Sequence, residues 1–319
     1  MGLEDIKKNN ERRCIILGGC GFLGSVVAKR LVSKGWNVRI FDKEDADTSR
    51  LRSVMSSIEL IRGDLMNVDD LVCALDGIPI VLHFVGTSIP QTSMENIQFD
   101  IKTNVLPTVQ LLELMRKNGA QRLLFSSSGG TVYGVAKKCV PIPETHTTCP
   151  IVAYGISKLM IEKFIHLFSF NYNFPAVILR FANPYGESQQ VISPQGAVSA
   201  FIKSIRQGKP IHIWGDGSNV RDYLYEEDLA TAVESVLNKP ELTGTFNVGT
   251  GKGTSLNELV ALITKIFGRS SRVIQESARS FDVPYNVLDI DHIRRTTDWQ
   301  PSYTLEQGIR KMECLLKNQ

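Results

Sequence analysis

Two short stretches carry the side chains of this chain that could do chemistry. The first is SSSGGTVYG, Ser126 to Gly134, where three hydroxyls lead into two glycines at the expected end of a buried strand. The second is YGISK, in which Tyr154 and Lys158 are four residues apart and share one face of a helix. To act as a base at neutral pH, a phenol must have its pKa lowered by about 3 units, or about 4 kcal/mol. A cation about 4 Å away, such as the Lys158 ammonium group, would supply an interaction of that order.

The elements that would position these residues alternate between short apolar runs and helical segments. Continuous apolar runs are typical of strands that are covered on both faces, as in a parallel sheet wrapped by helices. We therefore predict an α/β fold with a doubly wound parallel sheet of the Rossmann type. The predicted strands are RCIILGG, NVRIFDK, IELIRGDL, PIVLHFVG, QRLLFSSSG and AVILRFANPYG. Two helices are predicted at 22–35 and 103–119, closed by Gly35 and Gly119.

The regular pattern loosens after residue 182. Residues 183–222 are rich in Gly, Pro, Ser and Gln, and they predict loops around one helix at 198–207. Further elements are expected as helices at 256–267 and 305–316 and as an extended segment at 283–290.

These patterns predict two parts in one compact chain of 319 residues. Residues 1–182 would form a dinucleotide-binding domain, and residues 183–319 a smaller α/β substrate-binding lobe, with segments around 211–240 returning to the first domain. The lobe would lie over the carboxyl edge of the sheet, where open α/β sheets bind ligands.

Composition and charge exclude several classes of function. The net charge is +3 and no run of five or six like charges occurs, which argues against nucleic acid or an anionic membrane as a partner. The polar start MGLEDIKKNNERR lacks the apolar core of a signal peptide, and the five histidines show no metal-ligand spacing. We expect a cytoplasmic protein with reduced thiols and without a metal. The six scattered cysteines are Cys14, Cys20, Cys73, Cys139, Cys149 and Cys314.

A glycine-rich turn points to a dinucleotide cofactor. GGCGFLG places Gly18, Gly21 and Gly24 between a predicted strand and a predicted helix, where backbone N–H groups can approach a pyrophosphate. Asp42 ends the next strand, where a carboxylate can bind a ribose 2′-hydroxyl and repel a 2′-phosphate. The sequence therefore favours NAD over NADP.

The spacing G-x-x-G-x-x-G together with Tyr-x-x-x-Lys resembles the extended short-chain dehydrogenase/reductase family of nucleotide-sugar enzymes. The resemblance is strongest to the UDP-hexose 4-epimerases and runs from about Arg13 to Leu316. Further matching motifs are GDL, HFVG, TNV, RFANPYG and VRDY. The resemblance implies that the cofactor is bound by Gly18, Gly21, Phe22, Leu23, Gly24, Asp42, Asp64, Leu65, Phe84, Val85, Gly86, Asn104, Ser126, Tyr154 and Lys158.

The same resemblance assigns catalytic roles. Tyr154 would take the proton of a sugar hydroxyl while that carbon gives a hydride to NAD, and Lys158 would hold the ribose and lower the pKa of Tyr154. In relatives the third serine of the strand end binds the reacting sugar oxygen. Counting along the strand places Ser128 there, whereas counting back from VYG reaches Gly129, because this chain has one more residue in between. Thr131 is the second candidate for this hydroxyl.

Dehydratases of this family carry an Asp-Glu pair just after that hydroxyl, and decarboxylases carry a Glu. Here Gly130 and Thr131 stand in their place, and no carboxylate lies between Ser126 and Pro143. The sequence thus favours oxidation and reduction at one carbon, through a 4-keto sugar, over elimination.

A third set of matches concerns the nucleotide-sugar. Asn183, Arg221 and Arg279 match residues that hold the UDP diphosphate in relatives, and arginine suits a diphosphate because its planar donors pair with two oxygens. Tyr223 and Asp282 accompany them. Asn286 matches a position that limits sugar size in 4-epimerases, and a residue smaller than Tyr there favours UDP-N-acetylhexosamines, with UDP-glucose and UDP-galactose as further substrates.

Other functions stay open at this point. The same residues would serve a nucleotide-sugar dehydrogenase, reductase or dehydratase, or a regulator that binds NAD without catalysis. The nucleotide base and the hexose are not determined by the motifs. Relatives commonly dimerise through the helix that begins near Tyr154, and its face LMIEKFIHLF is compatible with a homodimer, although burial inside one chain would explain it equally well.

Overall fold

The computed structural model describes residues 12–120, 122–136, 140–189, 196–279 and 281–317. Residues 1–11 of the polar N-terminal start and Cys139 lie outside the described residues. The chain divides into two compact units, which are treated separately below. The first comprises the described parts of Met1–Ser127, Val152–Leu179 and Val233–Thr245, and the second those of Ser128–Ile151, Arg180–Ala232 and Phe246–Gln319.

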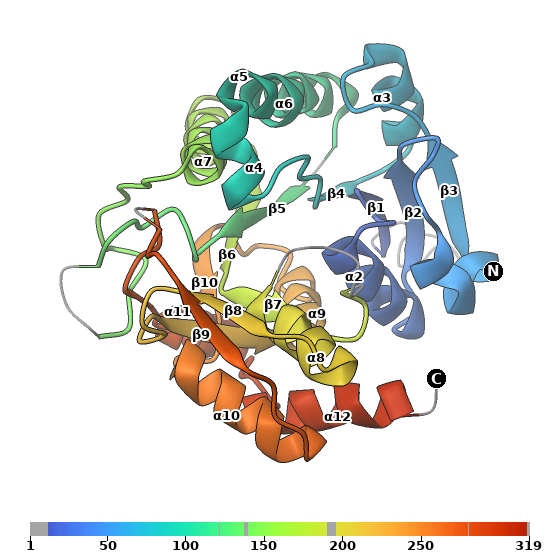
Figure 1. The fold of residues 1–319 in the computed structure, drawn as a ribbon. Helices are drawn as coiled ribbons and strands as arrows, with labels where there is room; N and C mark the ends of the chain where they lie inside the picture. The colour runs from blue at the N-terminus through green and yellow to red at the C-terminus, as the bar shows by residue number, and fades with distance from the viewer. Residues whose placement is uncertain (1–11, 121, 137–139, 190–195, 280, 318–319) are drawn as a thin grey trace. The chain divides into compact units, whose positions relative to one another are not determined.

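Among the described residues, seven strands form the main sheet (Figure 1). The pairs β1–β2, β2–β3, β1–β4 and β4–β5 are parallel, which confirms the predicted Rossmann-type sheet. Because the strand order reverses beside β1, the ends of β1 and β4 mark the switch point where such sheets bind ligands. In order across the sheet the strands are β10 (Gly244–Val248), β6 (Ala176–Phe181), β5 (Arg122–Ser128), β4 (Ile80–His83), β1 (Arg13–Leu17), β2 (Asn37–Asp42) and β3 (Ile58–Arg62).

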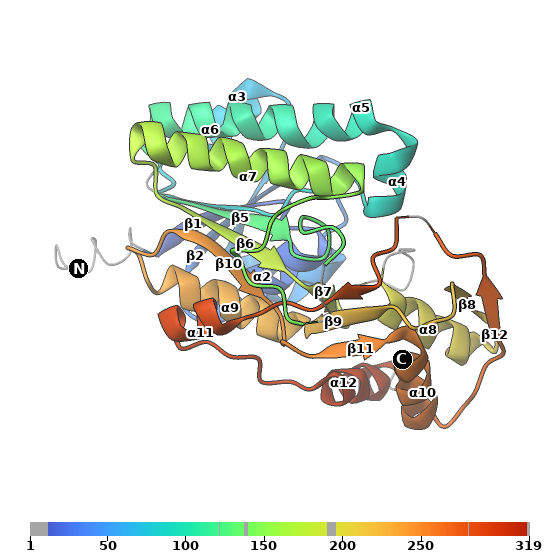
Figure 2. The same cartoon turned by 90° about the vertical axis from the view of Figure 1, so that its left-hand side faces the viewer.

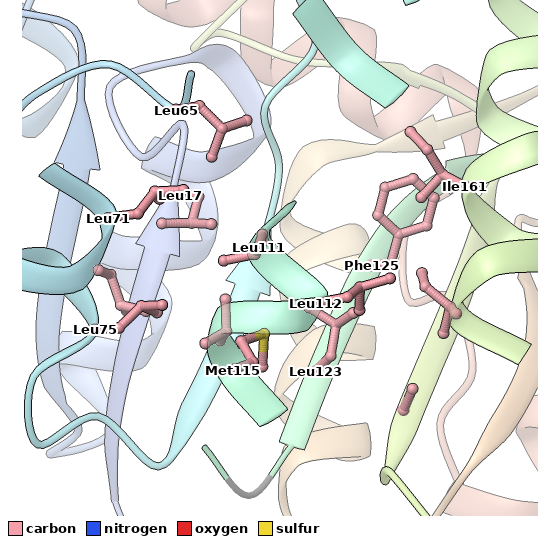
Figure 3. Close-up of a cluster of buried hydrophobic side chains, with 14 of the residues drawn as sticks. Leu17, Leu65, Leu71, Leu75, Leu111, Leu112, Met115, Leu123, Phe125 and Ile161 are labelled. Carbon is pink, nitrogen blue, oxygen red and sulfur yellow. The ribbon is translucent and has the colours of Figure 1, made fainter. Parts of the chain in front are cut away.

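Helices cover both faces of the sheet in the first unit. In both views α3, α6 and α7 lie on one face and α2 on the other (Figures 1 and 2). The apolar side chains of α3, α6 and α7 pack against those of β1 and β5, for example Leu71, Leu112 and Ile161 against Leu17 and Phe125 (Figure 3). The helices of this unit are α2 (Phe22–Ser33), α3 (Val68–Leu75), α4 (Pro90–Glu95), α5 (Ile97–Asp100), α6 (Leu106–Asn118) and α7 (Ala153–Tyr172), with a 3-10 segment at Ser49–Ser57.

The predicted helix ends agree with the backbone, whereas one predicted helix start does not. Gly35 and Gly119 adopt φ values of 76° and 71°, the left-handed conformation that glycine accepts without a steric cost. The segment expected as one helix from residue 103 begins instead as a π-helical turn, Ile101–Val105, which leads into α6. Residue types do not reveal such a turn, because it continues the apolar spacing of the helix that follows.

The second unit contains two smaller sheets. Strand β9 (Val220–Tyr225) pairs with β11, β13 and β7, and β8 pairs with β12. The helices α8, α10 and α12 pack on these strands through a second apolar core, which includes Phe201, Ile213, Leu259 and Ile309. The remaining strands are β7 (Asn183–Tyr185), β8 (Ile211–Trp214), β11 (Gly253–Ser255), β12 (Val273–Glu276) and β13 (Tyr285–Asn286). The helices are α8 (Ala197–Gln207), α9 (Glu226–Leu237, whose residues from Val233 on belong to the first unit), α10 (Leu256–Phe267), α11 (Asp291–Thr297) and α12 (Leu305–Lys317).

The three helices predicted for this part of the chain are present, within one residue of the expected bounds. The start of α10 shows why such a helix is predictable: Ser255 and Glu258 form a reciprocal capping box. Of the extended segment expected at 283–290, only Tyr285–Asn286 forms a strand. Among the described residues, no helix combines the length and apolarity that a membrane span requires.

Candidate active site and cofactor cavity

The first unit has a cavity of about 450 Å³ at the carboxyl ends of β1, β2 and β4. Two glycines make room for it. Gly18 has φ 79°, and a Cβ there would lie 2.9 Å from the backbone nitrogen of Val85. A Cβ on Gly24 would lie 2.3 Å from the carbonyl oxygen of Gly18, so α2 can begin directly against the turn only with glycine at this position. A cradle of bare backbone at a helix start suits a dinucleotide pyrophosphate.

Most of the predicted cofactor residues line this cavity. These are Gly18, Gly21, Asp42, Asp64, Leu65, Phe84, Val85 and Gly86. Phe22 and Leu23 form the first turn of α2. The cavity is also lined by residues that the sequence did not single out: Cys20, Lys43, Asp47, Arg50, Thr87, Phe99 and Thr103.

Asp42 lies at the end of β2 with its carboxylate held in place. Its Oδ2 accepts a hydrogen bond from the Cys20 backbone nitrogen at 2.8 Å, and its Oδ1 accepts one from the Lys43 nitrogen at 2.9 Å. Lys43 and Arg50 line the same end of the cavity. One carboxylate suited to ribose hydroxyls thus lies beside two cations that would attract a phosphate.

We therefore expect Asp42→Ala to lower the affinity for NAD by about tenfold or more, because it removes hydrogen bonds to a charged acceptor. Affinity for NADP should rise, since the repulsion of the 2′-phosphate is gone and Lys43 and Arg50 remain. Titration calorimetry with NAD and with NADP measures both changes in affinity. Asp64→Ala is the matched control, and it should change both affinities by a similar factor. Unchanged NADP affinity in Asp42→Ala would contradict the role of Asp42.

Tyr154 and Lys158 occupy the first turns of α7. The Tyr154 backbone nitrogen donates to Ser93 Oγ at 3.0 Å, which anchors the helix start. Lys158 is buried, and its Nζ donates to the Ser126 carbonyl oxygen at 2.8 Å. The same Nζ lies 5.7 Å from the centre of the Tyr154 ring. The predicted pair is therefore brought together beside the end of β5.

The electrostatics of this pair differ from the simple expectation. In the protein alone, burial raises the pKa of Tyr154 to about 12, and the Asp100 carboxylate contributes in the same direction. Burial lowers the pKa of Lys158 to about 8, opposed by the negative charges of Asp100 and Glu162. The lowering of the Tyr154 pKa that the sequence predicted from Lys158 is therefore not found in the protein alone, where burial and Asp100 raise this pKa.

Two predicted cofactor residues, Asn104 and Ser126, bind other parts of the protein. Asn104 Oδ1 accepts from the Thr87 backbone nitrogen at 3.0 Å, and its Nδ2 donates to Thr87 Oγ1 at 2.8 Å. Its contacts hold the loop after β4, whose Thr87 lines the cavity. Ser126 is buried and offers its carbonyl oxygen to Lys158.

The second unit has its own cavity, of about 530 Å³. It is lined by five of the predicted nucleotide-sugar residues: Asn183, Arg221, Tyr223, Arg279 and Asp282. These residues come from β7, β9 and the segment after β12, which are separated by up to about a hundred positions in the chain but adjacent in the fold. The site therefore has two arginines and one carboxylate around a single hollow.

Arg279 has a ring partner that the sequence did not indicate. Its guanidinium carbon lies 3.4 Å from the centre of the Trp214 ring, a stacking arrangement that holds the planar group in one orientation. Trp214 ends β8, and His212 of the same strand also lines the cavity. The Arg221 guanidinium is held by the Val220 carbonyl oxygen at 2.9 Å, and burial lowers its pKa while Asp282 raises it.

The stretch that follows Ser128 forms a tight turn within the second unit. The Ser128 carbonyl oxygen accepts from the nitrogens of Thr131 at 3.3 Å and Val132 at 3.1 Å. A Cβ on Gly130 would lie 3.8 Å from Ser128 Oγ and 3.7 Å from Asn183 Oδ1, so these two side chains share one small region. Ser128 is half-buried, whereas the hydroxyl of Thr131 is shielded from solvent and has no hydrogen-bond partner among the described residues.

Asn286 is fully buried and does not line the cavity. Its Nδ2 donates to the Gly129 carbonyl oxygen at 3.0 Å, which ties β13 to the turn after Ser128. The direct contact with a sugar that the sequence suggested requires exposed surface, and Asn286 has none in this structure.

The chain is similar to known proteins over nearly its whole length. A profile described as the NAD dependent epimerase/dehydratase family matches residues 14–249. A protein of Methanocaldococcus jannaschii assigned as a UDP-glucose 4-epimerase is 34% identical over 95% of this chain and 98% of its own length. The dTDP-4-dehydro-6-deoxyglucose reductase of Escherichia coli is 29% identical over 97% and 98% of the two chains. The crystal structure of the Thermotoga maritima UDP-glucose 4-epimerase with UDP-glucose superposes with a TM-score of 0.89 at 30% identity, covering 96% and 99% of the chains.

Proposed function

Because the chain belongs to the NAD-dependent epimerase/dehydratase family, we propose that it inverts C4 of a UDP-sugar through a transient 4-keto intermediate. The observation that carries this proposal is the cavity of the second unit, where Arg221, Arg279 and Asn183 gather as a diphosphate site would require. The absence of a carboxylate between Ser126 and Pro143 favours epimerisation over elimination.

In this proposal Tyr154 exchanges a proton with the C4 hydroxyl, and Ser128 holds the C4 oxygen. The glycine turn at Gly18, Asp42 and Lys158 would hold NAD, which would supply the hydride chemistry needed at C4. Lys158 keeps a positive charge beside the phenol and the ribose. With a pKa of about 12 in the protein alone, Tyr154 needs about 5 units, or about 7 kcal/mol, of stabilisation of its ionised form to be a base at neutral pH. The Lys158 charge, together with the positive ring of bound NAD, would have to supply it.

The sugar nucleotide would bind in the second unit with its diphosphate between Arg221 and Arg279. Trp214 offers a flat surface beside Arg279 that suits a nucleotide base. We further propose that the enzyme accepts a 2-acetamido group, and that Asn286 influences sugar size indirectly by fixing the Gly129 carbonyl through its amide. The side chain at position 286 would thus act on the turn after Ser128.

The test is incubation of the purified protein with UDP-glucose, UDP-N-acetylglucosamine and their C4 epimers, with product analysis by NMR. We expect interconversion of each C4 pair without added NAD and without a rise in NADH absorbance, since the hydride is returned in every cycle. Turnover that consumes added NAD or NADH would overturn the proposal in favour of a net oxidoreductase.

A reductase is the second candidate function. It is favoured by the similarity to the E. coli reductase over nearly the whole chain. Tyr154 would then give a proton once to the oxygen of a keto sugar, and NADH would be the source of the hydride. A 4-keto nucleotide-sugar supplied with NADH separates the two, because only the reductase would oxidise NADH in step with the sugar supplied.

A further inference from the structure

A buried carboxylate in the first unit joins the segments that carry the predicted cofactor and catalytic residues. Asp100, the last residue of α5, is 1% exposed. Its Oδ1 accepts hydrogen bonds from Ser88 Oγ and, at 3.0 Å, from Asn104 Nδ2. Its Oδ2 accepts one from Ser157 Oγ. Burial of a charge is costly unless it is satisfied, and these donors satisfy both carboxylate oxygens.

The three donors belong to three different elements. Ser88 follows the loop that lines the cofactor cavity, Asn104 lies in the π-helical turn, and Ser157 lies between Tyr154 and Lys158 on α7. Figure 2 shows α4 and α5 beside the end of α7 that carries these residues, and both helices pack on it. Removal of the carboxylate would therefore break one link between the loop after β4 and the catalytic helix, while the Tyr154–Ser93 hydrogen bond remains.

Few other charged groups face this region from the elements packed around it. On α7 the buried groups are Lys158 and Glu162, and Glu162 Oε1 accepts from Ser127 Oγ at 2.5 Å. On β4, burial and Lys158 lower the pKa of His83 to about 3, so this ring is neutral at working pH. The remaining titratable side chains on α4, the π-helical turn and α7 beyond Tyr154 are exposed: Glu95, Lys102, Lys163, His166 and Tyr172.

We propose that Asp100 is a positioning residue whose negative charge balances the positive charges around Tyr154, so that the phenol can both take a proton and give it back. This inference rests on the proposed epimerase function. In such a reaction one group removes the proton of the C4 hydroxyl during oxidation and returns it to that oxygen during reduction of the keto sugar. A base made too acidic by cations alone would not return the proton, because proton exchange is fastest when donor and acceptor have matched affinities near the operating pH.

The electrostatic effects on the two catalytic side chains distinguish Asp100 from its neighbour Glu162. The Asp100 charge raises the pKa of both Tyr154 and Lys158. The Glu162 charge raises the pKa of Lys158 alone. Asp100 therefore opposes ionisation of the phenol and at the same time keeps the lysine charged in spite of its burial. Neutralising Asp100 should lower both pKa values, and neutralising Glu162 should lower that of Lys158 alone.

The first experiment reads Lys158 directly, without turnover. Lysine labelled with ¹³C is titrated by NMR in the full chain, and the Lys158 signal is assigned by its loss in Lys158→Met. We expect a pKa of about 8 in the wild type and a value lower by about 1 unit in both Asp100→Asn and Glu162→Gln. An unchanged Lys158 titration in Asp100→Asn would overturn the proposal.

The second experiment measures kcat/KM against pH for the same proteins. Activity requires ionised Tyr154 and charged Lys158. In the holoenzyme, where the Tyr154 pKa is lowered below that of Lys158, the rate should rise as Tyr154 ionises and fall as Lys158 loses its proton. In Asp100→Asn both limbs should move to lower pH by about 1 unit, whereas Glu162→Gln should move the alkaline limb only. A profile in which Asp100→Asn loses rate without moving the acid limb would reduce Asp100 to a purely structural role and overturn the proposal.

Ser157→Ala keeps the test decisive if Asp100→Asn does not fold. This variant retains the carboxylate but removes a hydroxyl whose positive end faces it, so the negative charge acts more strongly on its neighbours. Both limbs and the Lys158 titration should then move to higher pH, opposite to Asp100→Asn. A shift to lower pH, or none, would count against the proposal.

A wild type that epimerises no UDP-sugar would refute the proposed function. The NMR titration of Lys158 would still show whether the Asp100 charge acts on this side chain.

Discussion

Replacement of Tyr154 by phenylalanine is expected to lower kcat for epimerisation by about 10²-fold to 10⁴-fold, the usual contribution of a positioned acid or base. The phenol oxygen is the only atom lost, and the backbone nitrogen that anchors the start of α7 on Ser93 remains. Affinity for NAD and for UDP should therefore stay within a factor of about two of the wild type. Product NMR at saturating UDP-sugar gives kcat, and calorimetry gives both affinities.

Tyr172→Phe is the matched control, because Tyr172 ends the same helix and is exposed. It should leave kcat unchanged. Lys158→Met should lower kcat and also weaken NAD binding, since this side chain is expected to hold the ribose. Retained activity in Tyr154→Phe would remove Tyr154 from the mechanism, and equal losses of kcat and NAD affinity would mark a defect of folding.

The sequence could predict features that depend on local chain geometry. Gly18 and Gly24 were identified because a turn between strand and helix needs bare backbone, and a Cβ at either position would indeed come within 3 Å of the main chain. The bounds of α10 follow from Ser255 and Gly268, a capping box at one end and a left-handed glycine at the other. The motifs also identified five residues that line one cavity of the second unit.

Other features depend on contacts between distant segments, which residue types do not reveal. Trp214 reads as one aromatic residue in a short strand, and its stacking on Arg279 arises only when β8 and the segment after β12 come together. Asn286 matched a position of interest, but its burial and its bond to Gly129 depend on the register of β13 beside β9. Asp100 carries no motif at all, and its role follows from donors on three separate elements.

The pKa of Tyr154 is another property that the sequence alone does not predict. The spacing of Tyr154 and Lys158 correctly placed a cation near the phenol, with 5.7 Å between the amino nitrogen and the ring centre. Spacing on one helix does not report how much water the fold removes, and here burial dominates and raises the pKa to about 12. The surrounding charges must therefore lower the Tyr154 pKa by more than they would for a tyrosine side chain in water.

Replacement of Arg279 or Arg221 by alanine is expected to weaken UDP binding by about 10-fold to 150-fold each, because each guanidinium would lose charge-assisted hydrogen bonds worth about 1.5–3 kcal/mol. Both side chains line the cavity of the second unit, and each is already held in place, Arg279 by the Trp214 ring and Arg221 by the Val220 carbonyl. Binding of a diphosphate would therefore cost little side-chain conformational entropy. Calorimetric titration with UDP measures the loss, and KM for the UDP-sugar should rise in parallel.

Two further variants separate shape from charge at this site. Arg279→Lys keeps the cation but loses the planar group that stacks on Trp214, so it should recover only part of the affinity. Arg272→Ala removes an exposed cation that does not line the cavity, and it should leave UDP binding unchanged. NAD binding depends on the cavity of the first unit and should be the same in all four proteins. UDP affinity within twofold of the wild type in both Arg221→Ala and Arg279→Ala would rule out this cavity as the diphosphate site, and the proposed substrate class would lose its main support.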